Sequence, residues 1–333
     1  MCKNSNIEVS VVMPIYNESK YIRNCIDSLL LQDYNFEKME WIFVDGNSTD
    51  DTRDIVEVYV KKYPGLIKLL SNPNKTVPYA MNIGIRASVG KYIVRLDAHA
   101  DYAKDYISKC VSYLNTMDID NVGGILETKG RGYVGSVIAK MLSSKFGVGN
   151  SNFRTAVESG YVDTVPFGAF RREVFEKWGY YDERLTRNQD NEMNYRIRKN
   201  NGKIYLANDI MLSYYCRDSI KGIADMALKN GKWNIITMYL CPGSMGIRHF
   251  IPLCFVCSII ALPLLSIFSK FFRWLFLAEI ILYFGLDVFF SLKLTNKFKE
   301  FWLLFILFPI FHIYYGVGSL TGIFSIKNFK GGN

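Results

Sequence analysis

The sequence predicts an α/β domain built on a mostly parallel sheet, followed by an α-helical transmembrane tail. From residue 9 onward, short runs rich in β-branched residues alternate with segments of helical periodicity, which is the pattern of a sheet covered by helices on both faces. After residue 247 the composition changes. This tail holds 21 of the chain's 50 aromatic residues but only 3 of its 31 acidic residues.

The composition also argues against several classes of protein. The net charge of +9 over 333 residues is mild, and no basic stripe with interleaved aromatic residues is present, so no nucleic acid is expected as a partner. The seven cysteines lack the spacing of a disulfide framework and are expected to be reduced thiols, as in a cytoplasmic domain. The first apolar run, 9–15, is too short for a signal peptide, which also favours a cytosolic domain.

The elements of the α/β domain are predicted from local patterns. The expected strands are 9–15, 40–45, 66–70, 92–97, 122–127, 163–170 and 203–207, and the expected helices are 19–32, 49–63, 77–88 and 188–199. The last two helices stop before Gly90 and Gly202, which we interpret as left-handed helix ends.

The chain is expected to divide into an α/β domain (1–217), an amphipathic interface helix with a linker (218–247) and a membrane domain (248–333). Within 218–233, Ile220, Ile223 and Leu228 share one stripe, whereas the lysines lie elsewhere. Periodicity alone suits a helix on an anionic membrane as well as an ordinary surface helix. Its place just before the tail favours the membrane.

The tail contains about three stretches long enough to cross roughly 30 Å of hydrocarbon. Residues 249–269 and 301–326 carry no formal charge, whereas 274–292 includes Glu279 and Asp287, so full spanning by 274–292 stays open. These two acids are expected to face neighbouring helices or interfacial water. Lysines after the second stretch give a weak bias that places that loop in the cytosol and the carboxyl terminus outside.

Polar residues at strand ends are the first candidates for a ligand site, because ligands of open α/β sheets bind there. The first two strands end in PIYNE (14–18) and VDGNSTD (44–50), without a dinucleotide fingerprint, and the chain has no P-loop motif. This argues against nicotinamide enzymes and P-loop NTPases. Glu18 and Asp45 could hold a base or ribose, although a turn and helix cap also explains 45–50.

Two further segments carry candidate chemistry. In RLDAHAD (95–101), Asp97 and His99 leave the strand on the same side, so a cation bound to phosphate oxygens could sit there. Taken alone, His99 is better explained as a satisfied polar residue than as a metal ligand, and only the neighbouring motifs favour the ligand. Farther on, Asp190 and Glu192 stand in the first turn of a helix, where the helix dipole stabilises acids. The alternative interpretation makes Asp190 a catalytic base.

Taken in order, six segments resemble the family 2 glycosyltransferases with a GT-A fold. They are VSVVMPIYNE, WIFVDGNSTDDT, AMNIG, GKYIVRLDAH, PFGAFRREVFEKWGYYDE and QDNEMNYRIRKNNGKI, which cover residues 9–207. The DAH form and the hydrophobic tail are most similar to the membrane-bound subgroup that includes the succinoglycan glucosyltransferases.

The resemblance implies a Rossmann-like GT-A catalytic domain that transfers a sugar, with inversion, from a UDP-linked donor to a membrane-anchored saccharide in exopolysaccharide or capsule synthesis. It implies that Asp190 is the base and that Asp97 and His99 hold a divalent metal, Mg or Mn. The residues implied to bind the nucleotide-sugar are Pro14, Tyr16, Glu18, Asp45, Asn82 and Asp97. Two departures are His99 in place of the commoner carboxylate and Gln189-Asp190 in place of the commoner ED pair. The absence of QxxRW favours transfer of one sugar per acceptor.

The implied partners are the nucleotide-sugar donor, a lipid-linked saccharide acceptor and the cell membrane, with a multi-pass tail and a cytosolic catalytic domain. Two alternatives stay open. A polyprenyl-phosphate sugar synthase would use an acceptor phosphate that is already anionic, which makes Asp190 less critical. A non-catalytic, degenerate membrane scaffold is the other, and His99 is the best argument for it.

Overall fold

The computed structural model describes residues 6–149, 152–155 and 158–329. Contacts divide the chain into two compact units. The sheet unit comprises Met1–Glu127 and Ala156–Tyr214, and the helical unit comprises Thr128–Thr155 and Tyr215–Asn333. The division into domains at 1–217, 218–247 and 248–333 stays a prediction. The contacts within the structure group residues 128–155 with the tail.

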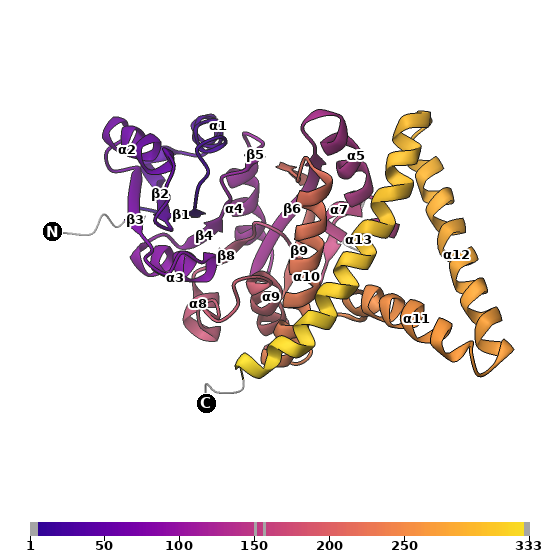
Figure 1. Ribbon diagram of the computed structural model, residues 1–333. Helices are drawn as coiled ribbons and strands as arrows, with labels where there is room; N and C mark the ends of the chain where they lie inside the picture. Colours follow the sequence, from indigo (N-terminus) through magenta and orange to yellow (C-terminus); the bar gives the residue numbers. More distant parts are fainter. Residues whose placement is uncertain (1–5, 150–151, 156–157, 330–333) are drawn as a thin grey trace. The chain divides into compact units, whose positions relative to one another are not determined.

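A mixed sheet forms the core of the sheet unit (Figure 1). Within the described residues it has nine strands in the order β3-β2-β1-β4-β8-β6-β9-β5, and β7 pairs with β9. The strands from β1 to β4 are mutually parallel where they pair, and β8 lies antiparallel between β4 and β6. The bounds are β1 (Val9–Ile15), β2 (Met39–Asp45), β3 (Ile67–Ser71), β4 (Tyr92–Arg95), β5 (Ala100–Tyr102), β6 (Asn121–Lys129), β7 (Gly160–Tyr161), β8 (Ala169–Arg171) and β9 (Ile204–Tyr215).

Amphipathic helices cover this sheet. In α1 the buried residues Ile22, Cys25, Ile26 and Leu29 have the spacing i, i+3, i+4 and i+7, so one face of the helix packs inward. The helices of the unit are α1 (Ile22–Leu29), η1 (Phe36–Lys38), α2 (Thr52–Lys62), α3 (Val77–Ala87), α4 (Tyr106–Thr116), α8 (Glu173–Trp178) and α9 (Gln189–Lys199).

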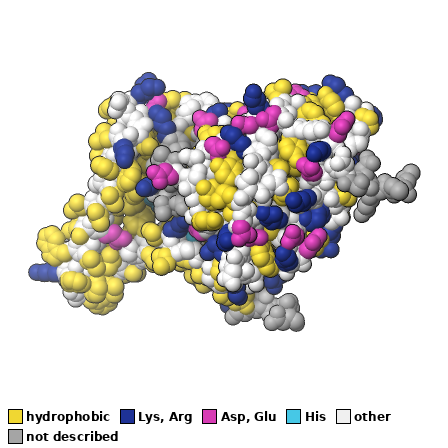
Figure 2. Space-filling model, turned by 180° about the vertical axis from the view of Figure 1, so that it is seen from behind, with side chains coloured by type: hydrophobic (Ala, Val, Ile, Leu, Met, Phe, Trp, Pro, Cys, Tyr) yellow, Lys and Arg dark blue, Asp and Glu magenta, His cyan; other side chains and the backbone are white. Residues whose placement is uncertain are grey.

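The helical unit contains, within the described residues, three helices long and apolar enough to cross a membrane. They cover Ile247–Leu265, Lys270–Leu294 and Phe298–Ser325, so the predicted positions of the apolar stretches are confirmed. In Figure 2, hydrophobic side chains gather at the left, over α11 and α12. The bounds are α5 (Gly132–Leu142), α6 (Lys145–Val148), α7 (Asn152–Thr155), α10 (Ile220–Leu240), η2 (Ile247–Phe250), α11 (Ile251–Leu265), α12 (Lys270–Leu294), α13 (Phe298–Ser325) and η3 (Ile326–Phe329).

The predicted α/β class is confirmed, but one predicted strand is wrong. Instead of a continuous strand over 163–170, β7 ends at Tyr161 and β8 begins at Ala169. Pro166 lacks an N–H for a sheet ladder, and Phe167 has a positive φ of 47°, which no regular strand allows. The strand predicted at 203–207 continues to Tyr215. Local patterns did not reveal α4, α5 or β5.

The predicted left-handed helix ends at Gly90 and Gly202 are also wrong. The left-handed residue after α9 is Asn201, with φ 63°, and α3 ends in the extended conformation of Ser88. Both glycines are instead required by close packing. A Cβ on Gly90 would lie 2.6 Å from the backbone N of Ser10, and one on Gly202 would lie 2.5 Å from the Trp178 ring.

The cysteines of the described residues are free thiols, as predicted. Burial raises the pKa of the Cys25 and Cys110 thiols well above their usual value, so both stay protonated and act as small apolar side chains. Cys2 lies outside the described residues.

The buried carboxylate of Glu40 connects neighbouring strands at the amino-terminal edge of the sheet. Glu40 is 1% exposed, and its oxygens accept hydrogen bonds from Ser10 Oγ at 2.6 Å, from the Val89 N–H at 2.7 Å and from Lys68 Nζ at 2.7 Å. Burial by itself would raise the pKa of Glu40, but the hydrogen bonds from Lys68, Ser10 and Val89 outweigh it and lower the pKa below its usual value.

We expect Glu40→Gln to destabilise the protein at neutral pH by about 1–3 kcal/mol, because the amide leaves buried donors unsatisfied. Since the folded-state pKa is lowered, the stabilisation from ionised Glu40 is present above the unfolded value of about 4.3 and is lost as the pH falls through the folded value. Thermal unfolding of solubilised protein at neutral and acid pH measures both effects. The control Glu57→Gln, at an exposed surface pair, should change stability by less than about 0.5 kcal/mol. Equal stability of the two variants would contradict the stabilising role assigned to the buried carboxylate of Glu40.

Candidate functional site

The strand ends that were predicted to carry the site meet at one edge of the sheet. β1 pairs in parallel with β2 and β4, so the segments after Ile15, Asp45 and Arg95 leave the sheet on the same side (Figure 1). β8 runs the opposite way, and the segment that precedes it reaches the same edge, where the Arg95 N–H donates to the Gly168 carbonyl at 3.0 Å. The edge therefore collects loops from four strands.

The loops after β1 and β2 are hydrogen-bonded to each other. The Asn17 N–H donates to Ser48 Oγ at 3.0 Å, and the Thr49 N–H donates to Asn17 Oδ1 at 2.8 Å. Asn17 and Asn47 both have positive φ, 55° and 60°. Such strained positions persist only where surrounding contacts hold them, so these loops form one preorganised surface.

Asp45 lies beneath this surface and is 1% exposed. Its Oδ1 accepts hydrogen bonds from Ser48 Oγ at 2.6 Å and from the Ser48 N–H at 3.2 Å, and its Oδ2 lies 3.5 Å from Arg53. These contacts are those of a tight turn, one of the two interpretations of 45–50. The contact between Asp45 and a nucleoside stays a prediction.

Glu18 and His99, which follow different strands, contact each other. His99 Nδ1 lies 3.1 Å from Glu18 Oε1, and the two side chains are 30% and 19% exposed. The imidazole also packs edge-on against Tyr214 at 5.2 Å between ring centroids. Glu18, which was predicted to bind the nucleotide, and His99, which was predicted to bind the metal, are therefore direct neighbours.

Arg95, which had no assigned role, joins the two remaining acids. It is the last residue of β4 and is 5% exposed. One guanidinium nitrogen forms an ion pair with Asp190, and the other lies 3.5 Å from Asp97 Oδ1. The signal in the sequence was a cation in an otherwise apolar strand, because a buried charge requires carboxylate partners.

Asp190 stands in the first turn of α9 with a 33% exposed side chain. Glu192 in the same turn is 8% exposed and binds Arg196 through both oxygens, at 2.6 and 2.9 Å. Asn188, which precedes the helix, has φ 61° and no capping hydrogen bond from its side chain. Only Asp190 of these two acids is both held by Arg95 and open to a ligand.

The three other predicted nucleotide-binding residues differ in accessibility. Tyr16 is 45% exposed and Pro14 is half-buried. Asn82 is 3% exposed, and its amide donates to the Tyr181 carbonyl and to Glu183, both at 2.9 Å, and accepts from the Tyr181 N–H at 3.0 Å. Asn82 therefore links α3 to the segment before α9, and its contact with a nucleotide stays a prediction.

The described residues gather no group of three His, Cys, Asp or Glu side chains that could hold a metal by themselves. Magnesium is commonly bound through one or two carboxylates together with substrate phosphates, so a diphosphate could complete a site at Asp97. The 3.5 Å separation from Arg95 leaves Asp97 Oδ1 without a short ion pair to that guanidinium. Asp97 fits such an ion better than His99, because imidazole favours softer metals.

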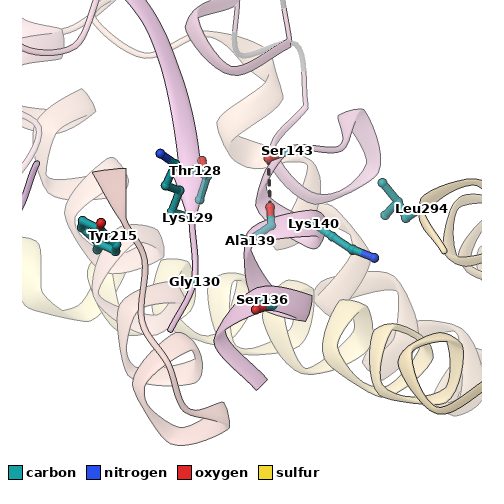
Figure 3. Close-up of a pocket in the computed structure, with 9 residues that line it drawn as sticks. All are labelled: Thr128, Lys129, Gly130, Ser136, Ala139, Lys140, Ser143, Tyr215 and Leu294. Carbon is teal, nitrogen blue, oxygen red and sulfur yellow. Dashed lines mark hydrogen bonds between the residues drawn. The ribbon is translucent and has the colours of Figure 1, made fainter. Parts of the chain in front are cut away.

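A separate pocket of about 470 Å³, open to the surface, lies in the helical unit (Figure 3). Its lining includes Lys129 at the end of β6, Lys140 and Ser143 of α5, Tyr215 and Leu294. None of the predicted site residues lines it.

Sequence comparison shows relatives of known family. Residues 10–179 match the model of Glycosyl transferase family 2. The chain is 30% identical, over 67% of its length and 71% of the relative's, to dolichyl N-acetyl-alpha-D-glucosaminyl phosphate 3-beta-D-2,3-diacetamido-2,3-dideoxy-beta-D-glucuronosyltransferase of Methanococcus voltae. It is 27% identical, over 73% of its length and 74% of the relative's, to the succinoglycan biosynthesis protein ExoA of Rhizobium meliloti.

Solved structures share the fold. A mannosyltransferase from Pyrobaculum calidifontis, in complex with GDP-Man and Mn²⁺, aligns with a TM-score of 0.67 and 17% identity over 97% of this chain and 88% of that chain. Residues 1–349 of S. aureus TarS align with a TM-score of 0.53 and 17% identity over 97% and 92%. The sheet unit is thus a Rossmann-like GT-A domain, and the chain belongs to Glycosyl transferase family 2.

Proposed function

We propose that the protein transfers one sugar, with inversion, from a UDP-linked donor to a membrane-anchored saccharide in exopolysaccharide or capsule synthesis. The observation that carries this proposal is the position of Asp190, an accessible carboxylate that Arg95 connects to Asp97 at the edge where the strand loops meet. The two curated relatives support the acceptor class, because one is named for a dolichyl-linked sugar phosphate and the other for succinoglycan biosynthesis.

In this reaction the acceptor hydroxyl oxygen attacks the anomeric carbon of the donor sugar. A bond forms between them as the bond from that carbon to the diphosphate breaks, and Asp190 accepts the hydroxyl proton. General base catalysis of this kind contributes about 10² to 10⁴ in rate. The contact with Arg95 positions the carboxylate of Asp190 and compensates its charge.

The donor would lie across the joined loops after β1 and β2. Tyr16 offers an exposed ring there. The other residues that would contact the donor are Pro14, Glu18, Asp45 and Asn82. A divalent Mg or Mn ion, when bound, neutralises charge that develops on the leaving diphosphate. Asp97 and His99 would hold this ion, and release of His99 from Glu18 would be part of forming that site.

The apolar helices support a multi-pass location in the cell membrane. The proposal places the GT-A domain in the cytosol, next to a lipid-linked acceptor. The decisive experiment incubates membranes that contain the protein with a panel of nucleotide-sugars and extracted lipid-linked acceptors. We expect release of a nucleoside diphosphate and transfer of one sugar to the lipid fraction. Membranes that release no diphosphate from any donor would favour the non-catalytic scaffold.

We expect Asp190→Asn to lower the transfer rate by about 10² to 10⁴ while nucleotide binding stays within a few-fold of wild type, because the amide keeps the shape of the carboxylate but accepts no proton. Single-turnover transfer and nucleotide titration measure the two quantities. The matched control is Asp54→Asn, which changes an exposed acid in the first turn of α2.

If Asp190 serves only the helix dipole, the two Asn variants will behave alike, and the assignment of the base fails. An active Asp190→Asn variant that transfers sugar to a polyprenyl phosphate would instead favour the synthase alternative, in which the acceptor is already anionic.

We expect chelation of divalent cations to lower transfer at least about a hundredfold, because the leaving diphosphate loses its counter-charge. Addition of Mg²⁺ or Mn²⁺ after removal of the chelator should restore the rate, and Asp97→Asn should respond to neither ion. Rates in EDTA and in graded metal measure this dependence. Full activity in excess chelator would exclude the proposed metal.

We expect Arg95→Met to lower the transfer rate by about 10- to 100-fold, because a misplaced catalytic group can cost that much. In the Asp190→Asn background the same substitution should cost far less, since the carboxylate that Arg95 positions no longer accepts a proton. Arg95→Lys keeps the charge but loses the planar fork and should recover part of the rate. Equal losses in both backgrounds would show that Arg95 acts independently of Asp190.

A further inference from the structure

The three apolar helices are not equivalent. Within the most apolar window of each helix, 44% of α13 is buried inside the structure, compared with 6% for α11 and 11% for α12. Helices surrounded by lipid expose most of their surface in the isolated protein, as α11 and α12 do. A large part of α13 is covered by protein instead.

The covering elements follow α13 along most of its length. Near its start, Glu300 forms an ion pair at 2.6 Å with Lys140, whose side chain extends from α5 (Figure 3). Farther along, α13 joins one apolar cluster with α5 and α10, made of Val137, Ile138, Met141, Leu142, Ile223, Ala227, Leu304, Leu307, Phe308 and Phe311. Its second half packs against α10 and α11.

The contact between α10 and α13 is backbone to backbone. A Cβ on Gly231 would lie 1.9 Å from the Tyr315 carbonyl oxygen, and a Cβ on Gly318 would lie 2.0 Å from the Leu228 carbonyl oxygen. Asn234 donates a hydrogen bond to Tyr315 Oη, and Ser319 Oγ donates to the Gly231 carbonyl at 3.3 Å. These two helices therefore share one environment.

α10 does not suit the interior of a bilayer. It is not among the helices apolar enough to cross, and Lys221, Asp225 and Lys229 form an exposed stripe at four-residue spacing. β9 ends at Tyr215 and α10 begins at Ile220. The four residues between them reach at most about 18 Å, which is less than the roughly 30 Å of hydrocarbon, so α10 starts on the side of the sheet unit.

If α13 crossed the bilayer, α10 would also lie within the hydrocarbon, because the two helices are in direct contact. Leu228 of α10 contacts Gly318, and Ala227 belongs to the cluster with Phe311, so Asp225 and Lys229 would lie near the depth of the middle of α13. Charged side chains at that depth are costly. The opposite face of α13 is exposed and apolar, with Trp302, Ile306, Ile313, Val317 and Phe324 on one side of the helix.

We propose that α10 and α13 form a platform on the membrane surface, that the exposed face of α13 lies against the lipid of the leaflet on the side of the sheet unit, and that only α11 and α12 cross the bilayer. The carboxyl terminus is then on the same side as the GT-A domain. This topology replaces the predicted three membrane spans and the predicted position of the carboxyl terminus outside the cell. The inference rests on the membrane location in the proposed function.

Depth measurements along α13 test the platform. Nitroxide labels are placed singly at Trp302, Ile306, Ile313, Val317 and Phe324 of the full-length protein, with accessible native cysteines replaced by alanine. The protein is reconstituted in phosphatidylcholine–phosphatidylglycerol vesicles, and the accessibility of each label to oxygen and to a polar nickel chelate gives its depth. We expect similar depths at all five positions. A crossing helix would change depth by about 33 Å between positions 302 and 324, and a label at the midplane near Ile313 would overturn the proposal.

Labels at Leu275, Leu282 and Phe289, on exposed positions of α12, are the matched control. They should pass through the bilayer midplane. Shallow labels on both helices would mean that the membrane location itself is wrong, whereas deep labels on both would leave that location intact and overturn only the platform.

Protease protection of tags provides a second test. One epitope tag follows Asn333 and another is inserted between Ile267 and Phe268, each in the full-length chain. In sealed vesicles of known orientation, we expect the two tags to lie on opposite sides of the membrane, with the carboxyl-terminal tag on the side of the GT-A domain. Two tags on the same side would overturn the proposal.

Discussion

The arrangement of the site depends on one buried charge. The guanidinium of Arg95 is almost fully enclosed at the end of β4, and an uncompensated charge in that position would cost several kcal/mol. Its partners are Asp97, two residues along the chain, and Asp190, in the first turn of α9. The need to pair this charge thus connects a helix late in the chain to the central strand and places an accessible carboxylate beside the strand ends.

The loops around this charge are held in unfavourable backbone conformations. Asn17, Asn47, Phe167 and Asn188 all have positive φ, and each stands in a segment that adjoins β1, β2, β8 or α9. Strain of this kind persists when hydrogen bonds over-determine it, as between the loops after β1 and β2. A regular sheet therefore supports an edge whose loops are already ordered for binding.

In the helical unit, the apolar composition of a helix does not determine whether protein or lipid surrounds it. α11, α12 and α13 are similarly apolar, yet α13 is covered by α5 and α10. Leu, Ile and Phe side chains pack against protein or lipid with comparable ease, so hydropathy alone does not distinguish the two surroundings. The glycine contacts between α10 and α13 do distinguish them, because they require a protein backbone in direct contact.

The sequence by itself determined the features that depend on neighbours in the chain. The apolar runs of β1, β2 and β4, the stripe of α1, the apolar tail and the polar strand ends all follow from local periodicity and composition. Only the tertiary structure decided which strand ends meet, that Arg95 pairs with a residue 95 positions away, that Asn82 is bound to Tyr181, and that 128–155 belongs with the tail. These contacts join residues far apart in the chain, and local patterns carry no information about such pairings because the free energy that selects them arises only when the whole domain packs.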